Sequence, residues 1–401
     1  MVGPAAGHGS DGVRGMSLPA FGAAFRRLFL VRLLGTVSLR FAYPFLPAIA
    51  DGLGVGIGAV GLALAAGEAA GLLAPLVGRR LDRIGRRRGM TDGLIIGAAG
   101  CAVAAIAPGA VAFGIGLFGI AVGRAFYDIS LGAWIGDEVE FARRGRASGI
   151  GELAWSGAFL LGVPVAGLIM SATSWRVPYL LSAVVMLVSI PVVRATLDDR
   201  TPQPVAGAPA AAHARPSLLH LAVFCTSLGA ALLLVTEGAW FELDLGLTER
   251  AISGVVVLLG IGEVVGALLA AGLADRIGKR LTMVAGLVAL VPAAVAMGLI
   301  DSSQAAGVAA AFVVGLGFEL AFVAALPLVV EVPEERRAGS LSLAIASLTG
   351  ARTVAAIVGT AVFDTSGMGA VAVLAVPALL AALVVVATSV REPILAPVSS
   401  P

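Results

Sequence analysis

Apolar residues in this chain come in stretches of about twenty, separated by short segments that carry most of the charge. As α-helices rising about 1.5 Å per residue, such stretches are long enough to cross a hydrocarbon core of about 30 Å. The first half holds six of them, at roughly 27–49, 56–78, 90–108, 111–136, 147–170 and 177–193. Six more follow, at roughly 218–239, 253–273, 281–300, 305–331, 340–362 and 369–390. The pattern predicts an all-α membrane protein with twelve transmembrane helices.

The segment between the two sets is rich in Pro, Ala and Asp and contains no spanning stretch. The first two dozen residues are rich in Gly, Ala and Ser, and further apolar stretches follow them rather than a cleavage site, so we expect no signal peptide. The predicted units are a disordered N-terminal tail (1–25), an N-terminal six-helix lobe (26–196), a linker (197–216), a C-terminal six-helix lobe (217–391) and a C-terminal tail (392–401).

The positions of the basic residues predict the orientation of the helices. Of the 27 Lys and Arg, 21 lie in tails and loops that are cytoplasmic if both termini are inside. Only Arg176 and Arg250 lie in external loops, and the remaining four lie within spans. This bias follows the positive-inside rule, and it predicts a multi-pass protein of the inner (cytoplasmic) membrane with both termini and the linker in the cytoplasm.

The composition excludes several classes of protein. With 59% hydrophobic residues, 13% charged residues and a mean hydropathy of +1.00, the chain has more apolar surface than a soluble fold can cover. The formal charge is only +2 and the basic residues are scattered, which argues against a nucleic-acid partner. Cys101 and Cys225 are isolated within apolar stretches, as is typical of buried thiols. We therefore expect a lipid bilayer around the protein and no metal or cofactor.

The two halves repeat a pattern between their second and third spans. Gly67-Glu68-Ala69-Ala70-Gly71 precedes Asp82-Arg83-Ile84-Gly85-Arg86-Arg87 in the first half. Gly262-Glu263-Val264-Val265-Gly266 precedes Asp275-Arg276-Ile277-Gly278-Lys279-Arg280 in the second. The repeat predicts duplicated lobes related by an axis along the membrane normal.

The first of these loops carries a recognisable motif. Residues 78–87 read Gly-Arg-Arg-Leu-Asp-Arg-Ile-Gly-Arg-Arg, which resembles the cytoplasmic G-x-x-x-D-R-x-G-R-R motif of the major facilitator superfamily. Its fixed positions are Gly78, Asp82, Arg83, Gly85, Arg86 and Arg87. The second copy matches at Asp275, Arg276 and Gly278 but has Ala271 in place of the first glycine.

The resemblance implies a latch on the cytoplasmic side that favours the outward-open state. Asp82 would sit against the positive N-terminal end of the eleventh helix, near Ser340, and Arg83 or Arg86 would reach Asp137 at the end of the fourth. In the second copy the acidic partner would be Glu331. For the flanking arginines of the loop, the alternative is that they only orient the protein.

Ionisable residues within the spans are the candidates for chemistry. We count nine of them. At about 3 kcal/mol each, their exposure to lipid would cost on the order of 25 kcal/mol, so they must form ion pairs or contact water. They are Arg32, Arg40, Glu68, Arg124, Asp128, Glu152, Glu263, Glu319 and Arg352. Arg124 and Asp128 form an i,i+4 pair. On the first helix, Arg32, Thr36, Arg40, Tyr43 and Pro47 recur at helical spacing and predict a polar stripe that faces a cavity.

Two interpretations of these residues remain open. Glu68, Glu152 and Arg352 suit structural ion pairs between helices. By the family resemblance, Arg40, Arg124, Asp128 and Glu319 lie on helices that line the central cavity. The predicted coupling residues are Asp128 with Arg124, and secondly Glu319. The predicted substrate cavity contains Arg40, Tyr43, Tyr127 and Phe322.

An enzyme would need a nucleophile, metal cluster or nucleotide loop, and the sequence has none of these. Arg124 resembles the arginine of the superfamily's fourth-helix motif, and Gly157, Gly162, Pro164 and Gly167 loosely resemble its antiporter motif. The resemblance therefore implies a functional monomer that exports a small drug or metabolite in exchange for protons. The alternative is a proton symporter or facilitator for an organic anion, for which paired arginines would be natural ligands.

Overall fold

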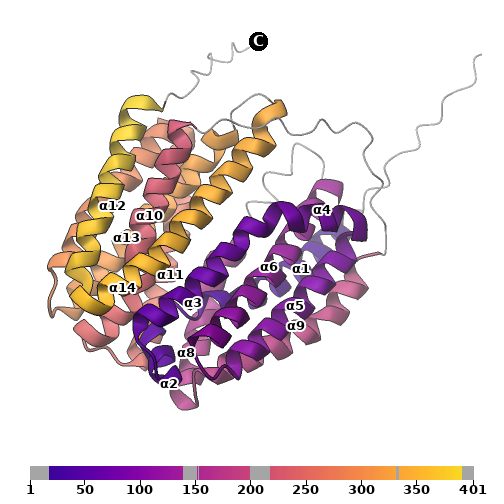
Figure 1. The fold of residues 1–401 in the computed structure, drawn as a ribbon. Helices are drawn as coiled ribbons and strands as arrows, with labels where there is room; N and C mark the ends of the chain where they lie inside the picture. Colours follow the sequence, from indigo (N-terminus) through magenta and orange to yellow (C-terminus); the bar gives the residue numbers. More distant parts are fainter. Residues whose placement is uncertain (1–17, 139–150, 152, 199–216, 331–333, 391–401) are drawn as a thin grey trace, which may run out of the picture.

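The computed structural model describes residues 18–138, 151, 153–198, 217–330 and 334–390, and these residues form two bundles of helices (Figure 1). The first bundle comprises α1 (Leu18–Arg40), α2 (Leu46–Leu53), α3 (Ile57–Ala69), the 3₁₀ turn η1 (Ala70–Leu73), α4 (Ala74–Ile84), α5 (Arg86–Ala105), α6 (Ala110–Glu138), the π-helix η2 (Ala158–Gly162), α8 (Val163–Ala172) and α9 (Arg176–Thr196). The second comprises α10 (Leu218–Ala239), the π-helix η3 (Trp240–Asp244), α11 (Glu249–Ile277), α12 (Lys279–Leu299), α13 (Gln304–Val330) and α14 (Glu334–Ser389).

Apart from a break in the first, the predicted spans coincide with helices wherever the structure describes them. Among the described residues, eight helices are long and apolar enough to cross a membrane, or nine if the pair Leu46–Leu53 and Ile57–Leu73, which is bent by 109°, is counted as one span. The last of the eight, Leu343–Ser389, contains two predicted spans. They are separated by Gly367, whose backbone is non-helical at φ 71° and ψ −174°. Most of the linker 197–216 and the whole C-terminal tail 392–401 lie outside the described residues, as do residues 1–17 of the predicted N-terminal tail. Residues 18–25 of that tail form the start of α1, so the expectation of a disordered tail up to residue 25 is wrong for them.

The first predicted helix, 27–49, is broken in the structure. α1 ends at Arg40, residues 41–45 form a turn, and α2 begins at Leu46. Pro44 has no backbone N–H to donate to the carbonyl of Arg40, so the helical ladder stops there. The Tyr43 N–H closes the turn onto that carbonyl at 3.4 Å. The expectation that Tyr43 continues a helical stripe is therefore wrong.

The internal repeat has a structural counterpart at two glycines. Gly85 joins α4 to α5 with φ 81° and ψ 163°, and Gly278 joins α11 to α12 with φ 90° and ψ 156°. This region of backbone space is essentially restricted to glycine. Corresponding positions of the two repeats thus adopt the same unusual conformation.

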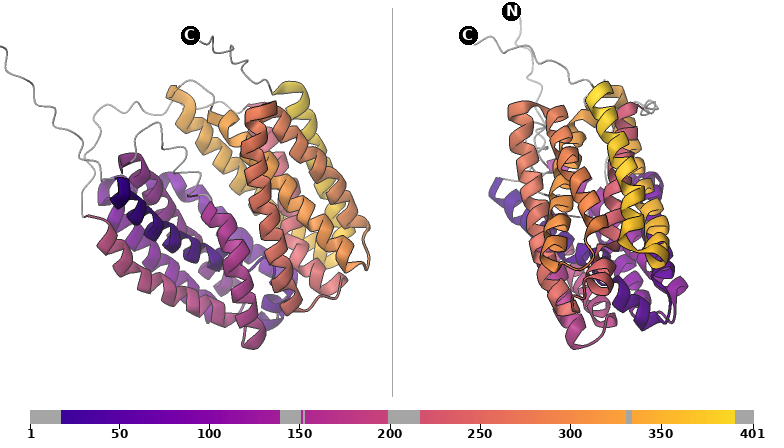
Figure 2. Two further views of the ribbon diagram at one scale, coloured as in Figure 1. Left: turned by 180° about the vertical axis from the view of Figure 1, so that it is seen from behind. Right: turned by 90° about the vertical axis from the view of Figure 1, so that its left-hand side faces the viewer.

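The two lobes meet at one end and separate toward the end from which the C-terminal trace leaves (Figures 1 and 2). Glycines let backbones approach closely where they meet. A Cβ built on Gly260 would lie 2.7 Å from the Leu160 Cα, and one on Gly238 would lie 2.6 Å from the Pro44 carbonyl carbon. These contacts lie in the half predicted to be external. With the predicted orientation, the lobes are closed outside and open inside.

Candidate substrate and coupling site

A small cavity lies between the lobes where they meet, and we call it the central cavity. Its volume of about 50 Å³ leaves room for only a few water molecules. The ionisable and phenolic residues lining it are Arg40, Tyr43, Glu237, Glu263, Glu319 and Arg352. Its aromatic walls are Trp155, Phe159 and Phe318. The remaining lining residues are Ser227, Ala231, Leu234 and Val235, all on α10.

A buried ion pair joins the two lobes across this cavity. The two terminal nitrogens of Arg40, at the end of α1, donate to the two carboxylate oxygens of Glu263 on α11 at 2.8 and 2.7 Å. The side chains are only 11% and 6% exposed. A guanidinium and a carboxylate that match atom for atom in this way form a strong, directional contact.

A second ion pair also crosses between the lobes. Arg352 on α14 donates to Glu68 on α3 at 2.8 Å and to the Tyr43 hydroxyl at 3.3 Å. The Tyr43 hydroxyl in turn donates to Glu68. The structural ion pairing expected of Glu68 and Arg352 is therefore present, and it also places Tyr43 in the cavity wall.

Three of the intramembrane arginines lie close to the ring of a single tryptophan. The guanidinium carbons of Arg124, Arg40 and Arg352 lie 4.3, 4.6 and 5.2 Å from the centroid of the Trp155 ring. Arg40 also stacks 3.9 Å over Phe159. Sequence analysis missed this tryptophan, which lies in the Leu153–Ala172 span, because an aromatic residue in an apolar helix carries no distinguishing local signal.

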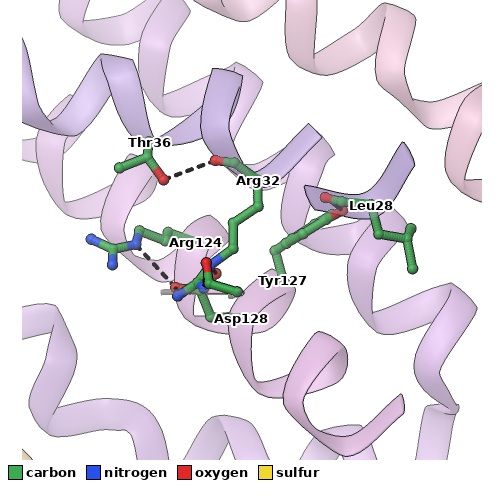
Figure 3. A network of polar contacts seen from close by, with 7 residues as sticks. Leu28, Arg32, Thr36, Arg124, Tyr127 and Asp128 are labelled. Carbon is green, nitrogen blue, oxygen red and sulfur yellow. Dashed lines mark hydrogen bonds and ion pairs between the residues drawn. The ribbon is translucent and has the colours of Figure 1, made fainter. Parts of the chain in front are cut away.

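The predicted pair of Arg124 and Asp128 is present, within a larger network (Figure 3). Arg124 donates to Asp128 at 3.1 Å, and Arg32 on α1 donates to the same carboxylate at 2.9 and 3.4 Å. Arg32 also donates to the Gly151 carbonyl at 2.6 Å. Two guanidinium groups thus compensate the charge of Asp128. The network lies in the N-terminal lobe, and its carboxylate is not part of the central cavity lining.

Two residues predicted for the substrate cavity lie elsewhere. The Tyr127 hydroxyl donates to the Leu28 carbonyl at 2.8 Å and ties α6 to α1 (Figure 3). Phe322 stacks on Phe318, with ring centroids 5.6 Å apart, but only Phe318 is among the lining residues. The side of α13 that faces the cavity is hard to assign from sequence because apolar residues lie all around this helix.

Two further carboxyl groups line the cavity. Glu319, which was predicted, lies on α13 and is 8% exposed. Glu237, which was not, lies on α10 and is 3% exposed. Our count of nine intramembrane ionisable residues omitted Glu237 although the predicted span 218–239 contains it. The signal that finds it is the one used for the others, a charged residue inside an apolar helix.

The profile of the Major Facilitator Superfamily matches residues 28–221 and 219–400. The chain belongs to the Major Facilitator Superfamily. It is therefore a multi-pass membrane transporter rather than an enzyme, and the all-α membrane fold predicted from the sequence is confirmed.

Known members of the superfamily resemble the chain to different extents. The uncharacterized MFS-type transporter YceJ of Bacillus subtilis (strain 168) is 24% identical over 224 residues, which are 54% of this chain and 57% of YceJ. The chain thus matches little more than half the length of that relative. Two crystal structures of a bacterial homolog of the human lysosomal transporter Spinster, both inward-facing, superimpose with TM-scores of 0.69 (unoccupied) and 0.67 (occupied). Their identities are 16% and 15%, over 93% of this chain and 95% of each of those chains.

Part of the superfamily's cytoplasmic motif is described. Arg86, at the start of α5, donates to Asp137 near the end of α6 at 3.0 Å, as predicted for one of the two loop arginines. Arg83 and Arg276 are exposed, and a Cβ on Gly78 would meet no described atom within 4 Å. The side chains of Asp82 and Asp275, and Glu331, lie outside the described residues. The observed ion pair joins two helices of one lobe.

Proposed function

We propose that this superfamily member is a proton-coupled exporter of a small amphipathic drug or metabolite, working by alternating access in the inner membrane. The observation that carries the proposal is a cavity at the contact between the lobes, with carboxyl groups set among aromatic and aliphatic walls. Such a cavity, apolar with a few convergent polar groups, is typical of a small-molecule site. Rocking of the lobes about it would expose it alternately to the two sides.

The two carboxyl groups predicted for proton coupling, Asp128 and Glu319, have different surroundings. Three hydrogen bonds from Arg32 and Arg124 compensate Asp128, which suits a structural role within the N-terminal lobe. Glu319 lines the cavity between the lobes, so its surroundings change when the lobes move. We therefore assign proton binding to Glu319 before Asp128. Competition between this proton and the substrate gives exchange by linkage.

The alternative of an organic-anion symporter draws less support from the cavity. The arginines that would bind an anion already hold carboxylates, Arg40 with Glu263 and Arg352 with Glu68. An entering anion would have to displace one of them and leave it buried without its partner, which is costly.

Transport into sealed proteoliposomes with an imposed pH gradient tests the proposal. We expect Glu319→Gln to abolish gradient-driven accumulation while equilibrium binding of the transported compound persists. Asp128→Asn should retain accumulation if Asp128 is a structural partner of Arg124. Accumulation driven by pH in both variants would refute proton coupling through either group.

A further inference from the structure

Glu237 is a buried acid that takes part in neither of the two ion pairs between the lobes. It lies on α10, 3% exposed, in the wall of the central cavity. Within the described residues, no group donates a hydrogen bond to its Oε2 atom. Ser227, nearly three turns earlier on the same helix and in the same wall, also has a buried hydroxyl with no described partner. Leaving such groups buried without a hydrogen bond is unfavourable, and most unfavourable for a charged group.

Among the residues that the structure describes, Glu237 has no ion pair with a Lys or Arg. Arg40 is matched by Glu263 and Arg352 by Glu68, each in a direct ion pair. Glu237 then adds an acidic group beyond those two pairs. A positively charged ligand would complement this surplus, whereas an anion would increase it.

The walls near Glu237 suit a cation that also carries apolar groups. The Phe318 ring lines the cavity, and the faces of aromatic rings attract cations, whereas the Trp155 and Phe159 rings already hold arginine guanidinium groups and supply apolar surface. Leu234 and Val235, within one turn of Glu237 on α10, supply aliphatic surface. A strongly hydrated inorganic ion would leave these walls unused.

We propose that Glu237 recognises the positive charge of the substrate, which makes the cargo an amphipathic organic cation such as a lipophilic ammonium or phosphonium compound. This inference rests on the proposed transport function, and it deepens it by naming the substrate class. Glu237 contacts the cation, while the aromatic walls hold its apolar groups. The volume of about 50 Å³ belongs to the arrangement in which the lobes touch around the cavity, and a ligand is admitted when the lobes move apart there.

The test measures equilibrium binding to the purified full-length protein in lipid nanodiscs with no gradient present. The probes are tetraphenylphosphonium and tetraphenylborate, which have nearly the same shape and opposite charge. Wild-type protein should bind the phosphonium saturably and in preference to the borate. Glu237→Gln should weaken phosphonium binding at least about tenfold, whereas Glu237→Asp should retain part of the affinity.

Glu242→Gln is the matched control, because it removes an acid from the following π-helix η3, outside the residues that line the cavity. It should bind the phosphonium like wild type. If Glu237→Gln does not fold, a hydrophobic carbodiimide can label wild-type carboxyl groups for mapping by mass spectrometry. Saturating phosphonium should then suppress labelling at Glu237 but not at Glu242.

Several results would overturn the proposal: no saturable phosphonium binding by wild type, preference for the borate, equal phosphonium affinity in wild type and Glu237→Gln, or unprotected labelling of Glu237. Failure of the proposed function gives a different result. Binding that depends on Glu237, together with phosphonium transport that ignores an imposed pH gradient, would uphold the recognition and reject proton coupling.

Discussion

Removing the acid of the buried inter-lobe ion pair should shift the protein away from the arrangement described here. Arg40 and Glu263 lie on different lobes and hold each other through two short hydrogen bonds. In Glu263→Gln the guanidinium loses its charged partner while it remains buried. The cost applies only while the lobes are closed around the pair, because separation of the lobes lets water reach Arg40.

The size of the shift follows from the burial of the pair. Removing one partner of a buried ion pair costs about 3–5 kcal/mol. A difference of about 1.4 kcal/mol changes an equilibrium constant tenfold. Arg40 keeps its stacking on Phe159 and Trp155, which is worth about 0.5–2 kcal/mol. We therefore expect the lower end of the range, a shift of about a hundredfold toward the state open on the predicted external side.

Double electron–electron resonance between two spin labels measures this shift. Ala172 at the end of α8 and Ser302 between α12 and α13 are exposed, lie on different lobes and occupy the predicted external side. The labels would be placed in a variant without Cys101 and Cys225. We expect a longer distance to dominate in Glu263→Gln, and the double variant Arg40→Gln, Glu263→Gln to move back toward wild type because it leaves neither charge unpaired.

Glu249→Gln provides the control, since it removes an acid from the start of the same helix, away from the cavity. Its distance distribution should match that of wild type. If Glu263→Gln also matches wild type, the ion pair does not stabilise the closed external side, and the reasoning above is wrong.

Three further predictions concern other parts of the fold. Single cysteines in the linker 197–216 should react only with membrane-permeant reagents in intact cells, and labelling by an impermeant maleimide would reverse the predicted orientation. Asp82→Asn should reduce transport and favour the inward-open state while changing substrate affinity less than about tenfold. Normal transport in this variant would mean that the charged loop only sets the orientation of the protein in the membrane. A Cβ on Gly61 would collide with Thr360 and lie 2.6 Å from the Ala356 carbonyl oxygen. Gly61→Val should therefore cost the closed arrangement about 1–3 kcal/mol, visible as a longer distance between the same spin labels, and an unchanged distance would contradict this.

The sequence predicted what depends on local pattern. Apolar length identified the spans, and the four-residue spacing of Arg124 and Asp128 predicted their ion pair. Contacts between lobes have no such spacing, since Arg40 and Glu263 are 223 residues apart and Arg352 and Glu68 are 284 apart. Each of these four residues stood out as a charge inside a span, but its partner depends on how the lobes dock.

Helix geometry explains the remaining differences. The stripe drawn through Tyr43 assumed an unbroken first helix, whereas the proline after it ends the ladder and turns the chain. On α13, Phe318 and Phe322 are one turn apart and flank Glu319 on a helix with apolar residues all around it, so spacing alone could not say which of them reaches the cavity.

The indole of Trp155 is shared by guanidinium groups from three helices, α1, α6 and α14, which belong to both lobes. A ring offers only two faces, so an arginine that withdraws leaves area for another to occupy. The ring therefore connects the Asp128 network inside one lobe with both ion pairs that cross between the lobes. A substitution at Trp155 should change all three arginine sites together, so that pairwise double-mutant cycles among Arg40, Arg124 and Arg352 lose their coupling energies when this one side chain is removed.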